Sequence, residues 1–287
     1  MTGGFAPNSQ SIMYYHSFAI EVALMVFMLL GAISFVLHAQ VFNGNMKLFK
    51  KDIEIRTMLI WLIFGIAVIT CSLVVANNYS NLPTLLRVGP FLLVSAFSTT
   101  GFQNISPGEI TQILPTGAFL VLAFIMGIGG SAGSTAGGIK LKRLGLAFKS
   151  VVSNVKEQIA PESAKVSTAY NHLGRQIIDR EIAQNSMIVF ILFIATYIIG
   201  CVVGIAYGYD ATLSLFESIT MASNGGLTCI AHPGMPAPLV LTYTIEMWAG
   251  RLEFITLIAM CAQVVVSVIP FRHIKRAQKR FVEWRNG

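Results

Sequence analysis

Three glycine-containing tetrads recur along the chain, and their residue types could line a path for a cation. They are Thr2-Gly-Gly-Phe5, Thr99-Thr-Gly-Phe102 and Asn224-Gly-Gly-Leu227. Glycine allows positive φ angles, so that successive backbone carbonyls can point in the same direction. Carbonyls arranged in this way replace the hydration shell of a cation, and small hydroxyl side chains add ligands without blocking the path. We therefore predict a carbonyl-lined cation filter built from these tetrads.

A short apolar segment precedes each of the last two tetrads, at 88–98 and 212–222. As a helix, each segment would be about 16 Å long. This length cannot cross a hydrocarbon core that is about 30 Å thick. We predict two re-entrant half-helices whose carboxyl-terminal ends, which carry the negative end of the helix dipole, face the tetrads. An ordinary turn between helices is the alternative for a single tetrad, and the recurrence of the pattern argues against it.

The segment 127–138 follows the apolar run 111–126, and half of its residues are glycine. Each glycine costs about 1 kcal/mol relative to alanine inside a helix, so the helix should break there. Broken backbone at membrane depth is tolerated only against protein or pore water, which makes this loop a candidate gate. Close packing of helices on the small residues 129–133 is one alternative. A phosphate-binding loop is disfavoured, because no lysine follows the glycines directly and no strand precedes them.

Arg251 is a basic residue deep inside an apolar segment. An uncompensated charge at the centre of a spanning helix costs about 2.5–3.5 kcal/mol on insertion scales, so Arg251 needs a partner. Glu246 and Glu253 are badly spaced to share its helix face. We expect its partner among the carbonyls of the loop 127–138, and a structural ion pair between spans remains the alternative.

Composition identifies an integral membrane protein. The sequence is 54% hydrophobic and 11% charged, with a mean hydropathy of +0.68, whereas a soluble domain has about 25% charged residues. All of the 20 lysines and arginines except Arg87 and Arg251 lie in three blocks between or after apolar segments. By the positive-inside rule, the loops 46–56 and 140–184 and the carboxyl terminus are predicted to be cytoplasmic. This distribution explains the net charge of +7 without nucleic acid binding.

Four apolar segments have the length of about 20 residues that a spanning helix needs. They are 18–39, 57–76, 185–206 and 238–269. Together with the half-helices and tetrads, they form a repeated unit of span, half-helix, tetrad and span. The predicted fold class is therefore an all-α integral membrane protein built from repeated units of a cation-channel-like pore.

Three stretches resemble the Trk/Ktr/HKT family of potassium transporters, and specifically its membrane subunits of the TrkH type. They are Ser98-Thr-Thr-Gly-Phe-Gln103, the run Met126–Lys140, and Met247-Trp-Ala-Gly-Arg-Leu-Glu-Phe254. The resemblance covers nearly the whole chain. It implies a K⁺ uptake pore of four repeats with one filter strand each, a broken span that obstructs the pore below the filter, and a pore-facing arginine in the last span.

The resemblance assigns a role to each candidate residue. The implied filter residues are Thr2, Gly3, Gly4, Phe5, Thr99, Thr100, Gly101, Phe102, Asn224, Gly225, Gly226 and Leu227. Those that would coordinate K⁺ are Thr100, Gly101, Asn224 and Gly225. The implied gate residues are Gly127, Gly129, Gly130, Ser131, Gly133, Ser134, Thr135, Gly137, Gly138 and Arg251.

The resemblance also implies that the chain is the carboxy-terminal portion of such a pore. Residues 1–45 would hold the end of the second repeat, 46–184 the third repeat with the gate loop and a basic cytoplasmic segment, and 185–287 the fourth repeat with a basic tail. The implied partners are K⁺, the plasma-membrane bilayer, a second copy in a homodimer, a ring of RCK-type nucleotide-binding cytosolic subunits and, if it is separately encoded, the missing amino-terminal half. An internal methionine or a misplaced start at Met1 is the alternative to separate encoding. No cofactor other than the transported K⁺ is expected.

Other functions stay open from the sequence. A secondary transporter of a small solute also contains broken helices at its midplane, and a Na⁺-permeable transporter would share the tetrads. An enzyme is not expected, because no acid–base or nucleophile set converges at membrane depth. Glu21 and Glu217 are predicted to be solvated at the interface or to make polar contacts behind the filter. The histidines lack metal-ligand spacing and are predicted to be surface or interfacial residues: His16, His38, His172, His232 and His273.

Overall fold

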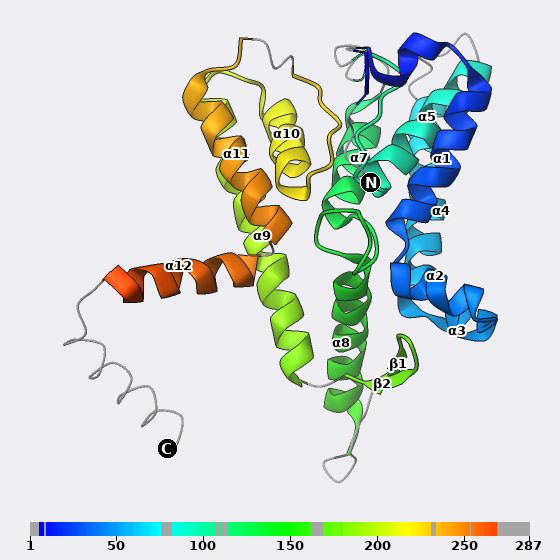
Figure 1. Ribbon diagram of the computed structural model, residues 1–287, viewed down its shortest axis with the longest axis vertical. Coiled ribbons are helices and arrows are strands. Elements are labelled where there is room, and N and C mark those ends of the chain that lie inside the picture. Colours follow the sequence, from blue (N-terminus) through cyan, green and yellow to red (C-terminus); the bar gives the residue numbers. More distant parts are fainter. Residues whose placement is uncertain are drawn as a thin grey trace. The chain divides into compact units, whose positions relative to one another are not determined.

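The protein is described by a computed structural model that covers residues 6–8, 10–75, 82–106, 110, 114–161, 169–178, 180–230, 234–252 and 254–268. The first tetrad, 2–5, lies outside these residues. The chain divides into two compact units, Met1–Arg251 and Leu252–Gly287. The larger unit holds the two remaining tetrads and the glycine-rich loop, and most of its described residues are helical (Figure 1).

The part of the chain before the glycine-rich loop is helical. Its elements are the 3₁₀ helix η1 (Ser11–Tyr15), α1 (Phe18–Ala32), α2 (Phe35–Phe42), α3 (Met46–Lys51), α4 (Ile53–Val75), α5 (Leu82–Phe97) and α7 (Thr116–Ile128). The predicted span at 18–39 is not one straight helix, because α1 and α2 are bent by 98° at a short break. The break lies at Ile33 and Ser34, whose backbones are extended or otherwise non-helical.

After the glycine-rich loop the chain continues in further helices and two short strands. They are α8 (Leu141–Ile159), β1 (Ala169–Asn171), β2 (Arg175–Ile177), α9 (Arg180–Ala206), α10 (Ala211–Ser223), α11 (Ala237–Leu252) and α12 (Phe254–Val268). Figure 1 shows α7 and α8 following one another almost along one line, with the loop between them. The apolar run 238–269 is thus divided between α11 and α12, where a single span was predicted.

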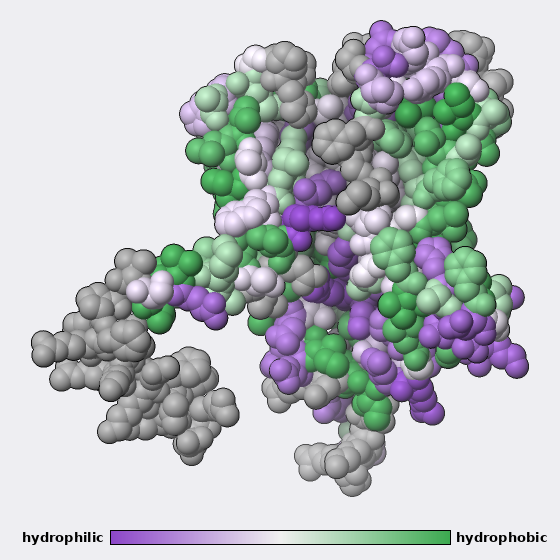
Figure 2. All heavy atoms as spheres, viewed as in Figure 1, coloured by the Kyte–Doolittle hydropathy of each residue, from purple (hydrophilic) through white to green (hydrophobic). Residues whose placement is uncertain are grey.

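By length and composition, two single helices could cross a membrane, at Ile53–Ser72 of α4 and Glu181–Ala206 of α9. The count rises to four if the pair α1 and α2 and the pair α11 and α12 each form one span. These are the four predicted apolar segments. Figure 2 shows hydrophobic side chains over α1 and hydrophilic side chains gathered around α3. The surface along these two helices thus has an apolar part at α1 and a polar part at α3.

Helices form at both segments that were predicted to be half-helices, although α5 begins at Leu82, six residues before the predicted start at 88. Helix α10 begins at the cap Asp210, whose carboxylate accepts a hydrogen bond from the Thr212 N–H at 2.9 Å, as expected for a side chain that satisfies a free amide at a helix start. Helix α5 packs against α1, α4 and α7, and α10 packs against α7 and α9. The stacked rings of Phe119 and Phe216, 4.3 Å apart, join α7 to α10.

The two short strands are an exception to the otherwise helical structure of the described residues. They form an antiparallel hairpin in which Tyr170 pairs with Gln176. Tyr170 is 2% exposed and packs with Ile53 and Leu146, and burial raises the pKa of its hydroxyl. The Lys149 ammonium of α8 donates to the carbonyl of Ala169 at 2.9 Å, and its burial, then the charge of Arg56, lowers its pKa. The hairpin is therefore fixed onto α4 and α8.

Candidate filter and gate

The two described tetrads have the same backbone conformation. Thr99 and Gly101 have φ angles of 49° and 83°, and the equivalent Asn224 and Gly226 have φ angles of 55° and 74°. Each half-helix thus ends in a left-handed residue, and a left-handed glycine follows two positions later. A left-handed glycine carries no Cβ penalty, which explains why glycine occupies the third position of both tetrads.

The hydrogen bonds that close the two half-helices also match. After α5, the N–H groups of Thr99 and Thr100 donate to the carbonyls of Ala96 and Ser95, both at 3.0 Å. After α10, the equivalent pairs are Asn224 to Met221 at 3.1 Å and Gly225 to Thr220 at 2.8 Å. In both cases the second bond spans six residues, as in a Schellman motif. The two segments are therefore structural repeats of one another.

The backbones of the two tetrads lie in direct contact. A Cβ added at Gly101 would lie 2.5 Å from the Cα of Gly226 and 2.9 Å from the carbonyl oxygen of Gly225. A Cβ added at Gly226 would lie 2.9 Å from the Cα of Gly101 and 3.3 Å from the oxygen of Thr100. Thr100 and Gly225 thus direct their carbonyl oxygens at the opposite tetrad. Both are among the four residues predicted to coordinate K⁺.

Side chains behind the tetrads fix the two strands. The hydroxyls of Ser98 and Thr100 are 2.7 Å apart, so the Thr100 hydroxyl already has a protein partner. The Asn224 amide donates to the Met247 carbonyl of α11 at 3.1 Å. Beyond the tetrads, the Gln103 amide donates to the Thr228 carbonyl at 2.9 Å and joins the outer flanks of the two repeats.

The carboxylate of Glu217 organises the segment that follows the last tetrad. One of its oxygens accepts hydrogen bonds from the Thr228 hydroxyl at 2.7 Å, the Cys229 N–H at 2.7 Å and the Ile230 N–H at 2.9 Å. Glu217 is fully buried. The expected polar contact behind the filter is therefore present, whereas interfacial solvation of Glu217 is wrong.

Glu217→Gln is expected to lower the free energy of unfolding by about 1–3 kcal/mol, because hydrogen bonds to a charged acceptor are stronger than those to a neutral one. Thermal unfolding of the purified chain in detergent measures the effect. Glu157→Gln, at an exposed position of α8, is the matched control. Equal unfolding temperatures for the two variants would contradict this role of Glu217.

Glu21 also departs from the expected interfacial solvation. It is 3% exposed, and its carboxylate accepts two hydrogen bonds from the Arg87 guanidinium, both at 2.8 Å. The pair joins α1 to α5. Two parallel bonds of this kind combine strength with a fixed geometry, so the pair holds α5 against α1.

The glycine-rich loop begins at Gly129, which has a φ angle of 70° and ends α7. Gly127 still belongs to the helix, so the break starts two residues later than predicted. The loop lies against the break between α1 and α2. The Ser131 N–H donates to the Ala32 carbonyl at 2.9 Å, and the Thr135 N–H donates to the Gly31 carbonyl at 3.2 Å. Backbone groups at the break between α1 and α2 therefore find their hydrogen-bond partners in the glycine-rich loop, and those of the loop find theirs at the break.

The same loop touches both described tetrads. The Gly137 N–H donates to the Thr99 hydroxyl at 2.7 Å. A Cβ at Gly137 would lie 1.9 Å from the Ser223 carbonyl oxygen and 3.5 Å from Asn224. Because backbone lies directly against this position, any residue larger than glycine would displace the loop. The loop thus closes the space at the inner ends of α5 and α10.

Arg251 reaches the loop. Its guanidinium donates to the Thr135 carbonyl at 3.3 Å, as the predicted pairing with a loop carbonyl requires. Glu246 instead accepts a hydrogen bond from Ser218 at 3.1 Å, and Glu253 lies outside the described residues. The structure therefore brings together Arg251, the loop and the two tetrads, although they are distant in the sequence.

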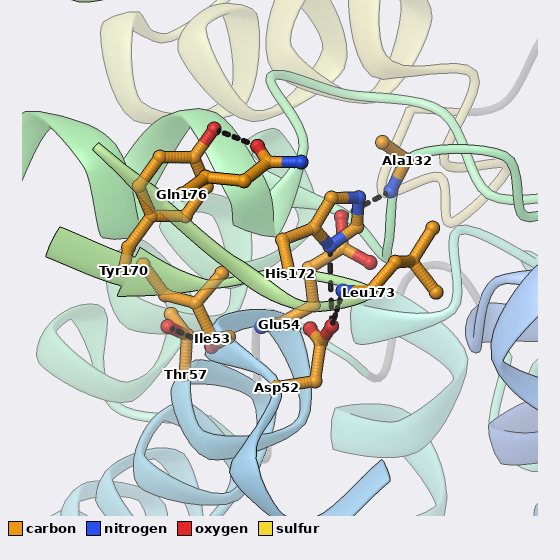
Figure 3. A network of polar contacts seen from close by, with 9 residues as sticks. All are labelled: Asp52, Ile53, Glu54, Thr57, Ala132, Tyr170, His172, Leu173 and Gln176. Carbon is orange, nitrogen blue, oxygen red and sulfur yellow. Dashed lines mark hydrogen bonds and ion pairs between the residues drawn. The ribbon is translucent and has the colours of Figure 1, made fainter. Parts of the chain in front are cut away.

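A cluster of three residues beside the loop was not recognised from the sequence (Figure 3). The Glu54 carboxylate accepts a hydrogen bond from the Ala132 N–H of the loop at 2.9 Å. Asp52 lies two residues before Glu54, and its carboxylate lies 3.2 Å from Nδ1 of His172. The prediction that His172 is a surface residue is wrong, because its side chain is only 11% exposed. The only sequence signal was a pair of acidic residues within a basic block.

Comparison with known proteins points to one family. A family model described as the cation transport protein TrkH matches residues 1–267. The chain is 30% identical over 267 residues to the Trk system potassium uptake protein TrkH of Escherichia coli, covering 90% of this chain and 53% of that protein. It is 29% identical over 270 residues to an uncharacterised cation transporter of Methanocaldococcus jannaschii, covering 93% of this chain and 52% of that protein.

A solved structure has the same fold. The crystal structure of the potassium transporter TrkH from Vibrio parahaemolyticus matches with a TM-score of 0.76 and 25% identity, covering 90% of this chain and 55% of that one. The chain therefore spans about half the length of the relatives that it matches.

Proposed function

Because this chain belongs to the TrkH family of membrane cation transport proteins, we propose that it forms part of a K⁺ uptake pore. The two tetrads supply filter strands, the loop 129–140 is the gate, and the process requires no covalent chemistry. The observation that carries this proposal is the pair of equivalent half-helix ends whose tetrads meet at Gly101 and Gly226. Two negative helix ends and carbonyl oxygens converging there favour a cation over an anion.

The gate is assigned from its contacts. The loop lies directly below both tetrads through Gly137, and Arg251 holds it from α11. A fixed positive charge beside the pathway repels a cation, so the closed arrangement would oppose conduction both sterically and electrostatically. Small residues let the loop move with little steric resistance.

The pore requires further filter strands, because the contact between Gly101 and Gly226 encloses no ion by itself. We assign 1–45 to the end of a second repeat, 46–184 to the third and 185–287 to the fourth. The first repeat and the start of the second would come from an amino-terminal half. That half would supply the further filter strands that complete the ring around the K⁺ ion.

Two protein partners follow from the same family assignment. We propose a homodimer in the plasma membrane and an RCK-type nucleotide-binding ring on the cytoplasmic side, where the loops 46–56 and 140–184 and the carboxyl terminus would lie. The surface of α8 supports docking there, since exposed apolar side chains and basic residues share it. The exposed apolar residues of α8 are Phe148, Val151, Val152, Val155 and Ile159.

Uptake of ⁸⁶Rb⁺ and ²²Na⁺ into vesicles tests the proposed function. The vesicles contain the chain alone or the chain co-expressed with a TrkH amino-terminal half. We expect uptake of ⁸⁶Rb⁺ in the pair, driven by membrane potential that supplies about 2.3 kcal/mol per charge for each 100 mV. Uptake of ²²Na⁺ at the same rate as ⁸⁶Rb⁺ would contradict the proposed selectivity for K⁺ over Na⁺. If neither preparation takes up either ion although both halves are inserted and associated, conduction by this chain is excluded.

A further inference from the structure

The cluster of Asp52, Glu54 and His172 lies on the cytoplasmic side of the gate loop (Figure 3). Asp52 separates α3 from α4, Glu54 lies in the first turn of α4, and His172 lies between β1 and β2. One ligand atom from each of the three side chains lies within 4.8 Å of the other two. Segments distant in the sequence thus bring two carboxylates and an imidazole together.

These three side chains are removed from water, and two of their polar atoms have no partner. Asp52 and Glu54 are 1% and 0% exposed, respectively. The Glu54 Oε2 atom is buried without a hydrogen bond, and so is Nδ1 of His172 apart from its approach to Asp52. A buried carboxylate oxygen without a partner is costly, so the cluster calls for a cation between its members.

The remaining atoms of the cluster are held in place by backbone amides. The Asp52 carboxylate accepts the Glu54 N–H at 2.8 Å through Oδ1 and the Leu173 N–H at 3.2 Å through Oδ2. The Glu54 Oε1 atom accepts the Ala132 N–H at 2.9 Å. Such outer hydrogen bonds orient metal ligands and leave the free atoms directed at the ion. Here they leave Glu54 Oε2 and His172 Nδ1 available.

The charge and spacing fit a divalent ion. Asp52 and Glu54 supply two carboxylates, and Lys142 contributes a positive charge that acts on Glu54. Zinc binds carboxylate oxygen and imidazole nitrogen at about 2.0–2.2 Å, so tetrahedral coordination places two ligand atoms about 3.4 Å apart. Asp52 Oδ2 and His172 Nδ1, which are 3.2 Å apart, already have about this spacing, and all three ligand atoms lie within 4.8 Å of one another. An imidazole with two carboxylates suits Zn²⁺ and similar transition metals rather than K⁺.

We propose that Asp52, Glu54 and His172 bind a divalent transition-metal ion such as Zn²⁺, and that the ion braces the gate loop against the cytoplasmic hairpin. The bracing follows because Glu54 holds the loop at Ala132 and Asp52 holds the hairpin at Leu173. Metal binding itself does not depend on the proposed K⁺ conduction. Only the consequence for the gate rests on that function.

Isothermal titration of the purified full chain with ZnCl₂, and the visible absorption of the Co²⁺-loaded protein, test the site. We expect one Zn²⁺ per chain. His172→Ala and Glu54→Gln should weaken binding more than about 100-fold, because even a partner of a metal ligand typically contributes 10–100-fold. His172→Cys should retain Zn²⁺, since a thiolate is also a zinc ligand, and its Co²⁺ spectrum should gain a sulfur-to-metal charge-transfer band.

His38→Ala is the matched control. The His38 imidazole, on α2, contacts the Leu30 carbonyl of α1 and lies outside the cluster. It should bind Zn²⁺ like the unaltered chain. Size-exclusion profiles identify variants that do not fold, and the partly exposed His172 is the position least prone to this. The proposal is overturned if the unaltered chain binds no Zn²⁺, if His172→Ala binds as well as His38→Ala, or if folded His172→Cys does not bind.

Discussion

Gly101→Ala is expected to reduce ⁸⁶Rb⁺ uptake at least about tenfold, measured in vesicles that hold this chain with the amino-terminal half. The new methyl group would lie 2.5 Å from the Cα of Gly226, and backbone atoms cannot turn aside as a flexible side chain can. Overpacking costs about 1–3 kcal/mol, and a left-handed backbone costs a non-glycine residue about 1–2 kcal/mol more. A cost of about 1.4 kcal/mol already corresponds to a tenfold change in rate.

Gly44→Ala separates the two causes. Gly44 lies between α2 and α3 with a φ angle of 80°, so alanine is strained there as well, yet no atom lies within 4 Å of the added methyl group. Uptake by this control should stay close to that of the unaltered chain. Gly226→Ala should behave like Gly101→Ala, because the contact is reciprocal. Equal uptake by Gly101→Ala and Gly44→Ala would show that the two tetrads do not meet in the conducting pore.

Arg251→Gln is expected to raise basal ⁸⁶Rb⁺ uptake about fivefold in the absence of any regulatory subunit. The guanidinium donates to the Thr135 carbonyl of the loop at 3.3 Å, and a contact worth about 1 kcal/mol favours the closed arrangement by this factor. Removal of the positive charge also removes a barrier to a passing cation. Initial uptake rates at fixed membrane potential measure the change.

Arg251→Lys is the matched control, because lysine keeps both the charge and a donor. It should leave the basal uptake within about twofold of the unaltered chain, as expected where a flexible ammonium replaces one guanidinium contact. A fall in uptake for Arg251→Gln would contradict the closing role and would indicate that the arginine supports the open pore instead.

The parts of this molecule that depend on local sequence were predictable. Helix α10 occupies Ala211–Ser223, against the predicted 212–222, because apolar length and flanking polar residues determine such a helix. The loop after α7 was predicted because glycine disfavours a helix wherever it occurs. Among the gate contacts, the sequence predicted the partner of Arg251, because a charged side chain in an apolar segment requires a polar group nearby.

Features that depend on tertiary contacts were missed. The segment 18–39 is mostly apolar, and the backbone groups at its bend near Ser34 bond to a loop about one hundred residues later, which no local pattern reveals. The hairpin has strands of three residues and is held by Tyr170 against α4 and α8. His172 gained its partners, Asp52 and Glu54, only through that hairpin.

In the proposed gating, the hydrogen bonds of the glycine-rich loop also set how often the loop is displaced. Four of its amide groups donate to the rest of the protein, at Ser131, Ala132, Thr135 and Gly137. If displacement exchanges these bonds for water at about 1 kcal/mol each, the displaced form is present in about one molecule in a thousand. A ligand or subunit that opens the pathway must therefore bind the displaced form about a thousandfold more tightly than the resting form merely to equalise the two.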